Sequence, residues 1–122
     1  MGKFVIKEVK TGFKFDLKAG NGEVIATSEV YTTEAACKKG IESVIKNAAV
    51  AGVEDQTVED FEKVKHPKFE LYEDKAGEFR FRLKATNGQV IAVSEGYSSH
   101  ANCLNGVESV KKNAPEAEVV SE

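Results

Sequence analysis

The chain has 122 residues, of which 41% are hydrophobic and 30% are charged, and its formal net charge is −3. This is the composition of a folded globular protein, with room for one ordinary domain or two very small ones. The acidic balance argues against a protein whose whole surface binds phosphate backbones. No apolar run reaches the ~18 residues that a membrane span needs, so we expect no membrane association.

The first half opens with three predicted strands. A short apolar run at 4–6 comes first, and strict alternation of apolar and polar residues over 13–19 then indicates a half-buried strand. Asn21-Gly22 follows, and it predicts a hairpin with a type I′ turn, in which both central residues have positive φ. The run at 24–26 supplies the return strand.

A helix is predicted next, because Cys37, Ile41, Val44 and Ala48 recur at helical spacing on one face. The hydroxyl side chains at 32–33 can cap its start. The short apolar stretch at 51–54 predicts a fourth strand. Residues 56–67 have no such pattern and are interpreted as a linker.

The second half repeats the first. At an offset of 66, 22 of the 36 positions from 13 to 48 are identical to those from 79 to 114. The pattern therefore predicts repeat 1 at 1–55, a linker at 56–67 and repeat 2 at 68–122, each repeat with the order β-β-β-α-β. The last strand of repeat 2 is predicted at 117–120.

Two such units are expected to form a single α+β domain, because about 50 residues bury too little apolar surface alone. We predict a pseudo-twofold antiparallel sheet with two helices packed on one face, and a monomer, since the repeats complete each other. Gly40 and Gly106 lie on the apolar helix face. A glycine there is costly, so we expect the backbone to approach a sheet or the other helix closely; drift since duplication is the alternative.

The repeat resembles the YegP-like family of small bacterial proteins. The resemblance is carried by Lys-Phe-Glu-Leu-Tyr at 68–72, Phe-Arg-Phe-Arg-Leu-Lys-Ala-x-Asn-Gly-Gln-Val-Ile-Ala at 79–92 and Cys-Leu-Asn-Gly-Val-Glu-Ser-Val-Lys-Lys-Asn-Ala at 103–114. It implies that the repeats exchange their C-terminal strands, so that each post-helix strand pairs with the other copy. The family has no characterised function, and no catalytic residue is carried over.

The sequence holds no enzyme motif. His66 and His100 have no ligands at metal spacing, so neither a metal nor a cofactor is expected. Cys37 and Cys103 fall on the core stripe and are interpreted as buried inert thiols, with a disulfide between them as the alternative. We therefore expect a protein that is not an enzyme. The N-terminus lacks a secretory signal, which predicts a cytoplasmic location.

Two sets of polar residues invite a functional interpretation. Ser-Glu at 28–29 and 94–95 and Glu-Ser at 42–43 and 108–109 occur in both repeats; capping, strand-end hydrogen bonds or a twofold-related site would each explain them. The second set is the polar face of the central strands, which is basic and has Tyr72, Tyr31 and Tyr97 as candidate neighbours. The candidate binding residues on it are Arg80, Arg82, Lys84, Lys14, Lys18 and Tyr72.

A basic face flanked by aromatic residues can bind single-stranded nucleic acid or another anionic ligand. The alternative is a solvated face with cross-strand charge pairs, for example to Glu70 or Glu78. The leading hypothesis is thus a non-catalytic binding or interaction module. A small enzyme without a recognisable motif and a stress-related structural or oligomeric protein are the other two hypotheses.

Overall fold

The structure is a computed structural model that describes residues 2–122. It is a single mixed α+β domain with eight strands and two α-helices. The first half contains β1 (Lys3–Val9), β2 (Gly12–Lys18), β3 (Val24–Thr27), α1 (Glu34–Ala48) and β4 (Gly52–Asp55). The second contains β5 (Lys68–Glu73), β6 (Phe79–Lys84), β7 (Val90–Val93), α2 (His100–Asn113), the 3₁₀ turn η1 (Ala114–Glu116) and β8 (Glu118–Ser121).

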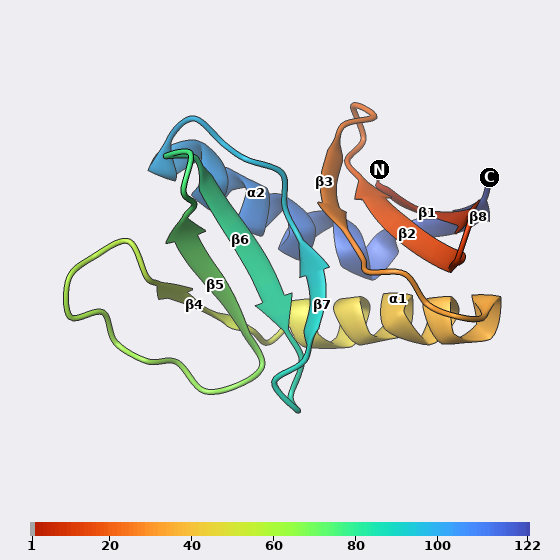
Figure 1. Ribbon diagram of the computed structural model, residues 1–122, viewed down its shortest axis with the longest axis horizontal. Helices are drawn as coiled ribbons and strands as arrows, with labels where there is room; N and C mark the ends of the chain where they lie inside the picture. Colours follow the sequence, from red (N-terminus) through yellow and green to blue (C-terminus); the bar gives the residue numbers. More distant parts are fainter. Residues whose placement is uncertain (1) are drawn as a thin grey trace.

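All eight strands belong to one sheet, in the order β4-β5-β6-β7-β3-β2-β1-β8. Both helices lie on the same face of this sheet, behind the strands in Figure 1. The core lies between the two layers and is built from the alternate residues that the strands turn toward the helices, such as Phe4, Phe15, Phe69 and Phe81. The halves of the sheet meet at β3 and β7, where a single pair, Thr27 and Val93, joins them.

The expectation of an antiparallel sheet is wrong at both edges. β4 pairs with β5 in parallel, and β8 pairs with β1 in parallel, so the sheet is mixed. Each helix crosses the strands instead of running back along one of them: α1 contacts β2 and then β7, β6 and β5. The chain therefore reaches the opposite edge of the sheet, where the alternation of a meander no longer sets the direction of the next strand.

The predicted hairpins form, but the predicted type I′ turn is wrong. Positive φ occurs at Gly22 and Gly88 and not at the asparagines that precede them. In the first hairpin the N–H of Gly22 donates to the carbonyl of Ala19 over 2.9 Å, and Asn21 Oδ1 accepts the N–H of Glu23. An asparagine side chain that bonds its own backbone two residues on holds such a turn without positive φ at the asparagine.

The helix starts are capped as the sequence predicts. Thr33 Oγ1 accepts the N–H of Ala36, and Ser99 Oγ accepts the N–H of Asn102. The serines of the repeated Ser-Glu pairs have a structural role. Ser28 Oγ accepts the N–H of Phe15 and donates to the carbonyl of Glu29, and Ser94 makes the same two bonds in repeat 2.

The helix glycines make room for tyrosine rings. Tyr97 stacks on Phe81 with ring centroids 6.4 Å apart, and its Oη would lie 2.5 Å from a methyl group built at Gly106. Tyr31 packs against Gly40 in the same way. Close packing is thus the reason for the glycines, but the partner is a side chain and not the backbone that we expected. The expectation that Tyr31 and Tyr97 flank the polar face is also wrong, because both rings lie on the helix side.

Neither helix within residues 2–122 is long and apolar enough to cross a membrane.

Changing Gly106 to Ala tests the tyrosine contact. In an open helix this change stabilises by about 0.5–1 kcal/mol, whereas here the added methyl collides with Tyr97 and Phe81. We predict that Gly106→Ala lowers the free energy of unfolding by about 1–3 kcal/mol, measured by urea denaturation. Asn105→Ala, at the exposed neighbouring position, is the control and should be neutral or stabilising. A gain in stability in Gly106→Ala would contradict the packing described here.

Candidate functional site

The sheet face opposite the helices, here called the polar face, carries one row of residues in register across all eight strands. Its members are the strand residues that point away from the core, one per strand. In sheet order the row is Glu54, Glu70, Arg82, Val93, Thr27, Asp16, Val5 and Val120. The row has three charged residues on the repeat 2 side and one on the other, so the two halves differ in charge.

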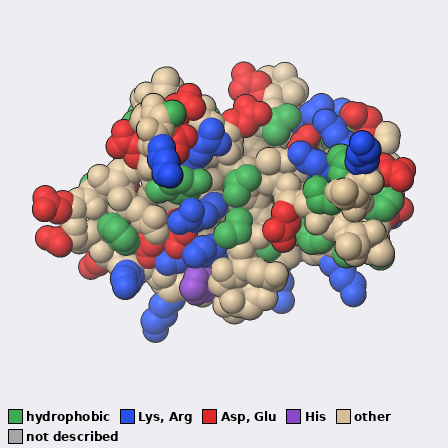
Figure 2. Space-filling view, in the orientation of Figure 1, with side chains coloured by type: hydrophobic (Ala, Val, Ile, Leu, Met, Phe, Trp, Pro, Cys, Tyr) green, Lys and Arg blue, Asp and Glu red, His purple; other side chains and the backbone are tan. Residues whose placement is uncertain are grey.

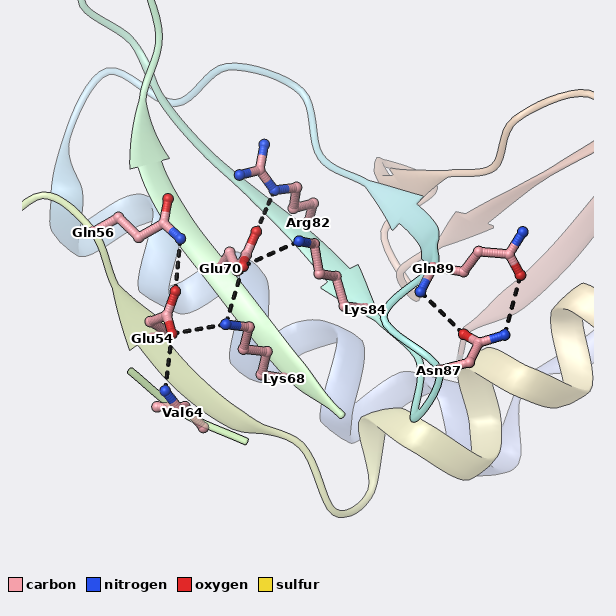
Figure 3. Close-up of polar contacts among 9 residues, drawn as sticks. All are labelled: Glu54, Gln56, Val64, Lys68, Glu70, Arg82, Lys84, Asn87 and Gln89. Atoms are coloured by element: carbon pink, nitrogen blue, oxygen red, sulfur yellow. Dashed lines mark hydrogen bonds and ion pairs between the residues drawn. The ribbon is translucent and has the colours of Figure 1, made fainter. Parts of the chain in front are cut away.

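Glu70 is the centre of the half that contains β4 to β7. Its carboxylate accepts from Arg82 Nε over 2.5 Å, from Lys68 Nζ over 3.2 Å and from Lys84 Nζ over 3.3 Å (Figure 3). These cations come from β5 and β6, where period-two alternation turns them to the same face as Glu70. Burial of Glu70 would raise its pKa, but the hydrogen bonds and charges of Arg82, Lys68 and Lys84 lower it below its usual value.

Glu54, on edge strand β4, extends this network. It is 2% exposed and accepts from Lys68 Nζ and from Gln56 Nε2, each over 2.7 Å, and from the N–H of Val64 over 2.8 Å (Figure 3). Gln56 and Val64 belong to the segment between the repeats, which therefore covers this end of the polar face. Burial alone would raise the pKa of Glu54, but the hydrogen bonds from Lys68, Gln56 and Val64 lower it to about 2.

The remaining predicted site residues of this half are also paired. Arg80 Nε lies 2.6 Å from Asp74 Oδ2, and the guanidinium of Arg82 lies 4.5 Å from the centre of the Tyr72 ring. Arg80, Arg82 and Lys84 each have a local carboxylate partner. Four cations (Lys68, Arg80, Arg82 and Lys84) face four carboxylates (Glu54, Glu70, Asp74 and Glu78). The geometry of this half matches the alternative of cross-strand charge pairs.

The other half of the polar face has an excess of lysines. Asp16 is 6% exposed and lies 3.1 Å from Lys7 Nζ and 3.9 Å from Lys14 Nζ, while Thr27 Oγ1 donates to it over 2.6 Å. The hydrogen bond and charge of Asp16 raise the pKa of Lys7. Within residues 2–122, neither Lys3 nor Lys18 has a carboxylate within 4.0 Å.

Two substitutions between the repeats explain this excess. Val5 and Val120 take the places in the row that Glu70 and Glu54 hold in the other half, and so two buried carboxylates are missing. Figure 2 shows Lys and Arg side chains over β5 and β6 and, apart from them, over β1 and β2. Lys3 and Lys7 were not predicted as site residues. The alternation over 3–7 and the difference between Val5 and Glu70 would have revealed them.

The groups that could carry covalent or metal chemistry are held in other roles. Cys37 and Cys103 are fully buried and free, and burial raises the pKa of Cys103 to about 11, so the thiol is protonated at neutral pH. His100 Nε2 lies 2.7 Å from Asp55 Oδ2. In the part of the chain that the structure describes, no three His, Cys, Asp or Glu side chains are grouped to hold a metal ion.

The fold and the repeat place the chain in a class of small tandem-repeat proteins of unknown function. The family described as "Domain of unknown function (DUF1508)" matches residues 10–55 and 74–121, and the chain belongs to it. A UPF0339 protein of Pseudomonas aeruginosa is 44% identical over 116 residues, which cover 94% of this chain and 92% of that protein. The UPF0339 protein YegP of Yersinia pestis is 40% identical over 114 residues, or 93% and 88% of the two chains.

Solved structures agree with this assignment. The solution NMR structure of a UPF0339 protein from Shewanella oneidensis has a TM-score of 0.80 and 35% identity, and the match covers 98% of this chain and 90% of that one. The solution NMR structure of yegP from E. coli, a protein of unknown function, has a TM-score of 0.80 and 34% identity over 99% and 92% of the chains. The resemblance to the YegP-like family is confirmed.

The lowered pKa of Glu54 makes a prediction about acid stability. A depressed folded pKa contributes stability above the unfolded value of 4.5, and this contribution is lost as pH falls toward 2. Glu54→Gln removes the charge and should lower the free energy of unfolding at pH 7 by about 3 kcal/mol.

Because its carboxylate is gone, Glu54→Gln should also lose less further stability than the parent between pH 4.5 and pH 2, as measured by chemical denaturation at each pH. Glu59→Gln, an exposed change in the same segment, is the control and should follow the parent. Equal acid sensitivity in Glu54→Gln and the parent would show that Glu54 does not contribute in this way.

Proposed function

We propose that this protein is a non-catalytic cytoplasmic module that binds a polyanion through the β1–β2 half of its polar face. The binding residues are Lys3, Lys7, Lys14 and Lys18. The observation that carries the proposal is the imbalance of charge in this half: Asp16 is the one carboxylate that is ion-paired to these lysines, and Lys3 and Lys18 have no carboxylate within 4.0 Å in residues 2–122.

The proposal shifts the site from the residues that the sequence favoured. Binding a polyanion through Arg80, Arg82 and Lys84 would require breaking their ion pairs with Asp74 and Glu70. Removing one partner of a buried pair leaves an uncompensated charge and costs about 3–5 kcal/mol. The exposed lysines of the other half carry no such cost, and Lys14 and Lys18 remain members of the site.

The expected ligand is a chain of phosphate or sulfate groups that is bound without readout of bases. Sequence-tolerant binding of single strands uses aromatic side chains as stacking surfaces. Tyr72 lies instead in the neutral half and packs against Arg82. Contacts by lysine alone give affinity that depends on released counterions and therefore on salt.

We further propose that the repeats form one pseudo-twofold unit with exchanged C-terminal strands, and that this unit acts as a monomer. The pairing of β4 with β5 and of β8 with β1 supports this proposal. The non-catalytic role is supported by the use of the most perturbed carboxylate, Glu54, in structural ion pairs.

The test is retention on heparin-agarose, followed by the salt dependence of binding to a single-stranded oligonucleotide. We predict that the double variant Lys3→Glu/Lys18→Glu elutes at lower salt than the parent. The slope of log K against log salt should also become shallower, by about one for each lysine lost.

Lys38→Glu/Lys39→Glu, on the exposed surface of α1, changes the net charge equally and serves as the matched control. It should elute close to the parent. The same elution shift in both double variants would mean that net charge alone matters, and no retention of the parent at low salt would exclude polyanion binding.

A further inference from the structure

Two grooves lie where the hairpin loop of one repeat meets the helix of the other. The groove between the β2–β3 loop and α2 has a volume of about 630 Å³, and the groove between the β6–β7 loop and α1 has about 350 Å³. Equivalent positions of the two repeats line both. The α2 groove contains Asn21, Asn105, Glu108, Ser109, Lys112 and Asn113. The α1 groove contains Asn87, Lys39, Glu42, Ser43, Lys46 and Asn47.

The exposed helix residues that both repeats share point to these grooves. Glu42 and Lys46 of α1 recur as Glu108 and Lys112 of α2, and all four are exposed and line a groove. Other exposed positions differ between the helices, for example Lys38, which is Leu104 in α2. Spacing of four residues would allow Glu-Lys pairs along the helix, but in residues 2–122 neither pair comes within 4.0 Å.

One substitution makes the two grooves different. In the α1 groove, Thr86 Oγ1 donates to Asn47 Oδ1 over 3.1 Å. In the α2 groove, Gly20 replaces Thr86. Asn113 Nδ2 still donates to the carbonyl of Ser109 over 2.8 Å, as Asn47 Nδ2 does to Ser43, which fixes the orientation of the amide. Within residues 2–122 no donor reaches Asn113 Oδ1.

The α1 groove therefore shows what a ligand of the α2 groove would supply. The threonine hydroxyl is replaced by space, beside an amide oxygen that accepts a hydrogen bond. Lys112 adds an ammonium group and Glu108 a carboxylate on the same helix face. This set matches a molecule with a hydroxyl for Asn113, an anionic group for Lys112 and a further hydroxyl for Glu108.

We propose that the α2 groove binds a small hydroxylated anion, either a sugar acid or a sugar phosphate, and that Thr86 closes the α1 groove to the same ligand. This site is separate from the polar face, because its residues come from the helix layer and a hairpin loop. It is thus independent of the polyanion site.

The test is a titration of ¹⁵N-labelled protein with D-gluconate and, separately, with glycerol 3-phosphate, followed by ¹H–¹⁵N correlation spectra. We expect saturable shifts at the side-chain amide of Asn113 and at the backbone of 105–113 and 19–22 with at least one probe. The probe that binds shows whether a carboxylate or a phosphate is preferred.

Exchanging the two loop residues provides matched variants. Gly20→Thr should weaken binding at least about tenfold, because threonine supplies the hydroxyl internally, and the same turn already holds threonine at 86. Thr86→Gly should add a second set of shifts at Asn47. If Gly20→Thr does not fold, Lys112→Ala replaces it and should also weaken binding.

Three outcomes would overturn the proposal: no saturable shift with either probe, unchanged binding in Gly20→Thr or in its replacement, or shifts confined to the lysines of the polar face. Lys3→Glu/Lys18→Glu should leave the groove shifts unchanged, so failure of one site is distinguishable from failure of the other.

Discussion

The structure depends on the two helices that cross the seam of the sheet. One residue pair, Thr27 and Val93, joins the halves of the sheet, which is too little to hold them in one plane. Helix α1 packs on β2 of its own half and on β5, β6 and β7 of the other, and α2 contacts β3, β5 and β6. Burial of the helix faces against both halves therefore supplies the cohesion that the backbone ladder lacks. The tyrosines that lie over Gly40 and Gly106 fix each helix at its place.

This arrangement leaves the opposite face of the sheet free to vary. The core residues and turns are nearly the same in both repeats, whereas the polar face has carboxylates at Glu54 and Glu70 in one half and valines at Val120 and Val5 in the other. The first half uses its charges internally and is further covered by the segment between the repeats. The second retains lysines with few partners. Duplication thus produced one half stabilised by buried ion pairs and one half whose charges can meet a partner.

Much of the fold follows from periodicity and repetition in the sequence. The strands, both helices and their caps could be predicted because they depend on local patterns, and Thr33 and Ser99 cap as expected. The parallel edge strands could not, since their direction depends on how a helix crosses the sheet. The turn type at Asn21-Gly22 was wrong because a side-chain hydrogen bond of Asn21 competes with the backbone preference.

The candidate site was harder to predict for a similar reason. Alternation correctly placed Arg80, Arg82 and Lys84 on one face, but their availability depends on Glu54, which comes from a strand of the other repeat, and on Asp74 in a loop. Lys3 and Lys7 became noticeable only when Val5 and Glu70 were seen at equivalent positions of the row. The groove residue Asn113 likewise gains its meaning from comparison with Asn47 and Thr86.

The central claim is that the helices bind the two repeats into one cooperative unit. Cys37 and Cys103 test it directly, since each is fully buried in one helix. The rate of thiol labelling should be measured for both cysteines across a range of urea below the unfolding transition. The account predicts the same free energy of opening at both, equal to that of global unfolding measured by circular dichroism. A distinctly lower value at one cysteine would contradict it, because one repeat would then open while the other remained folded.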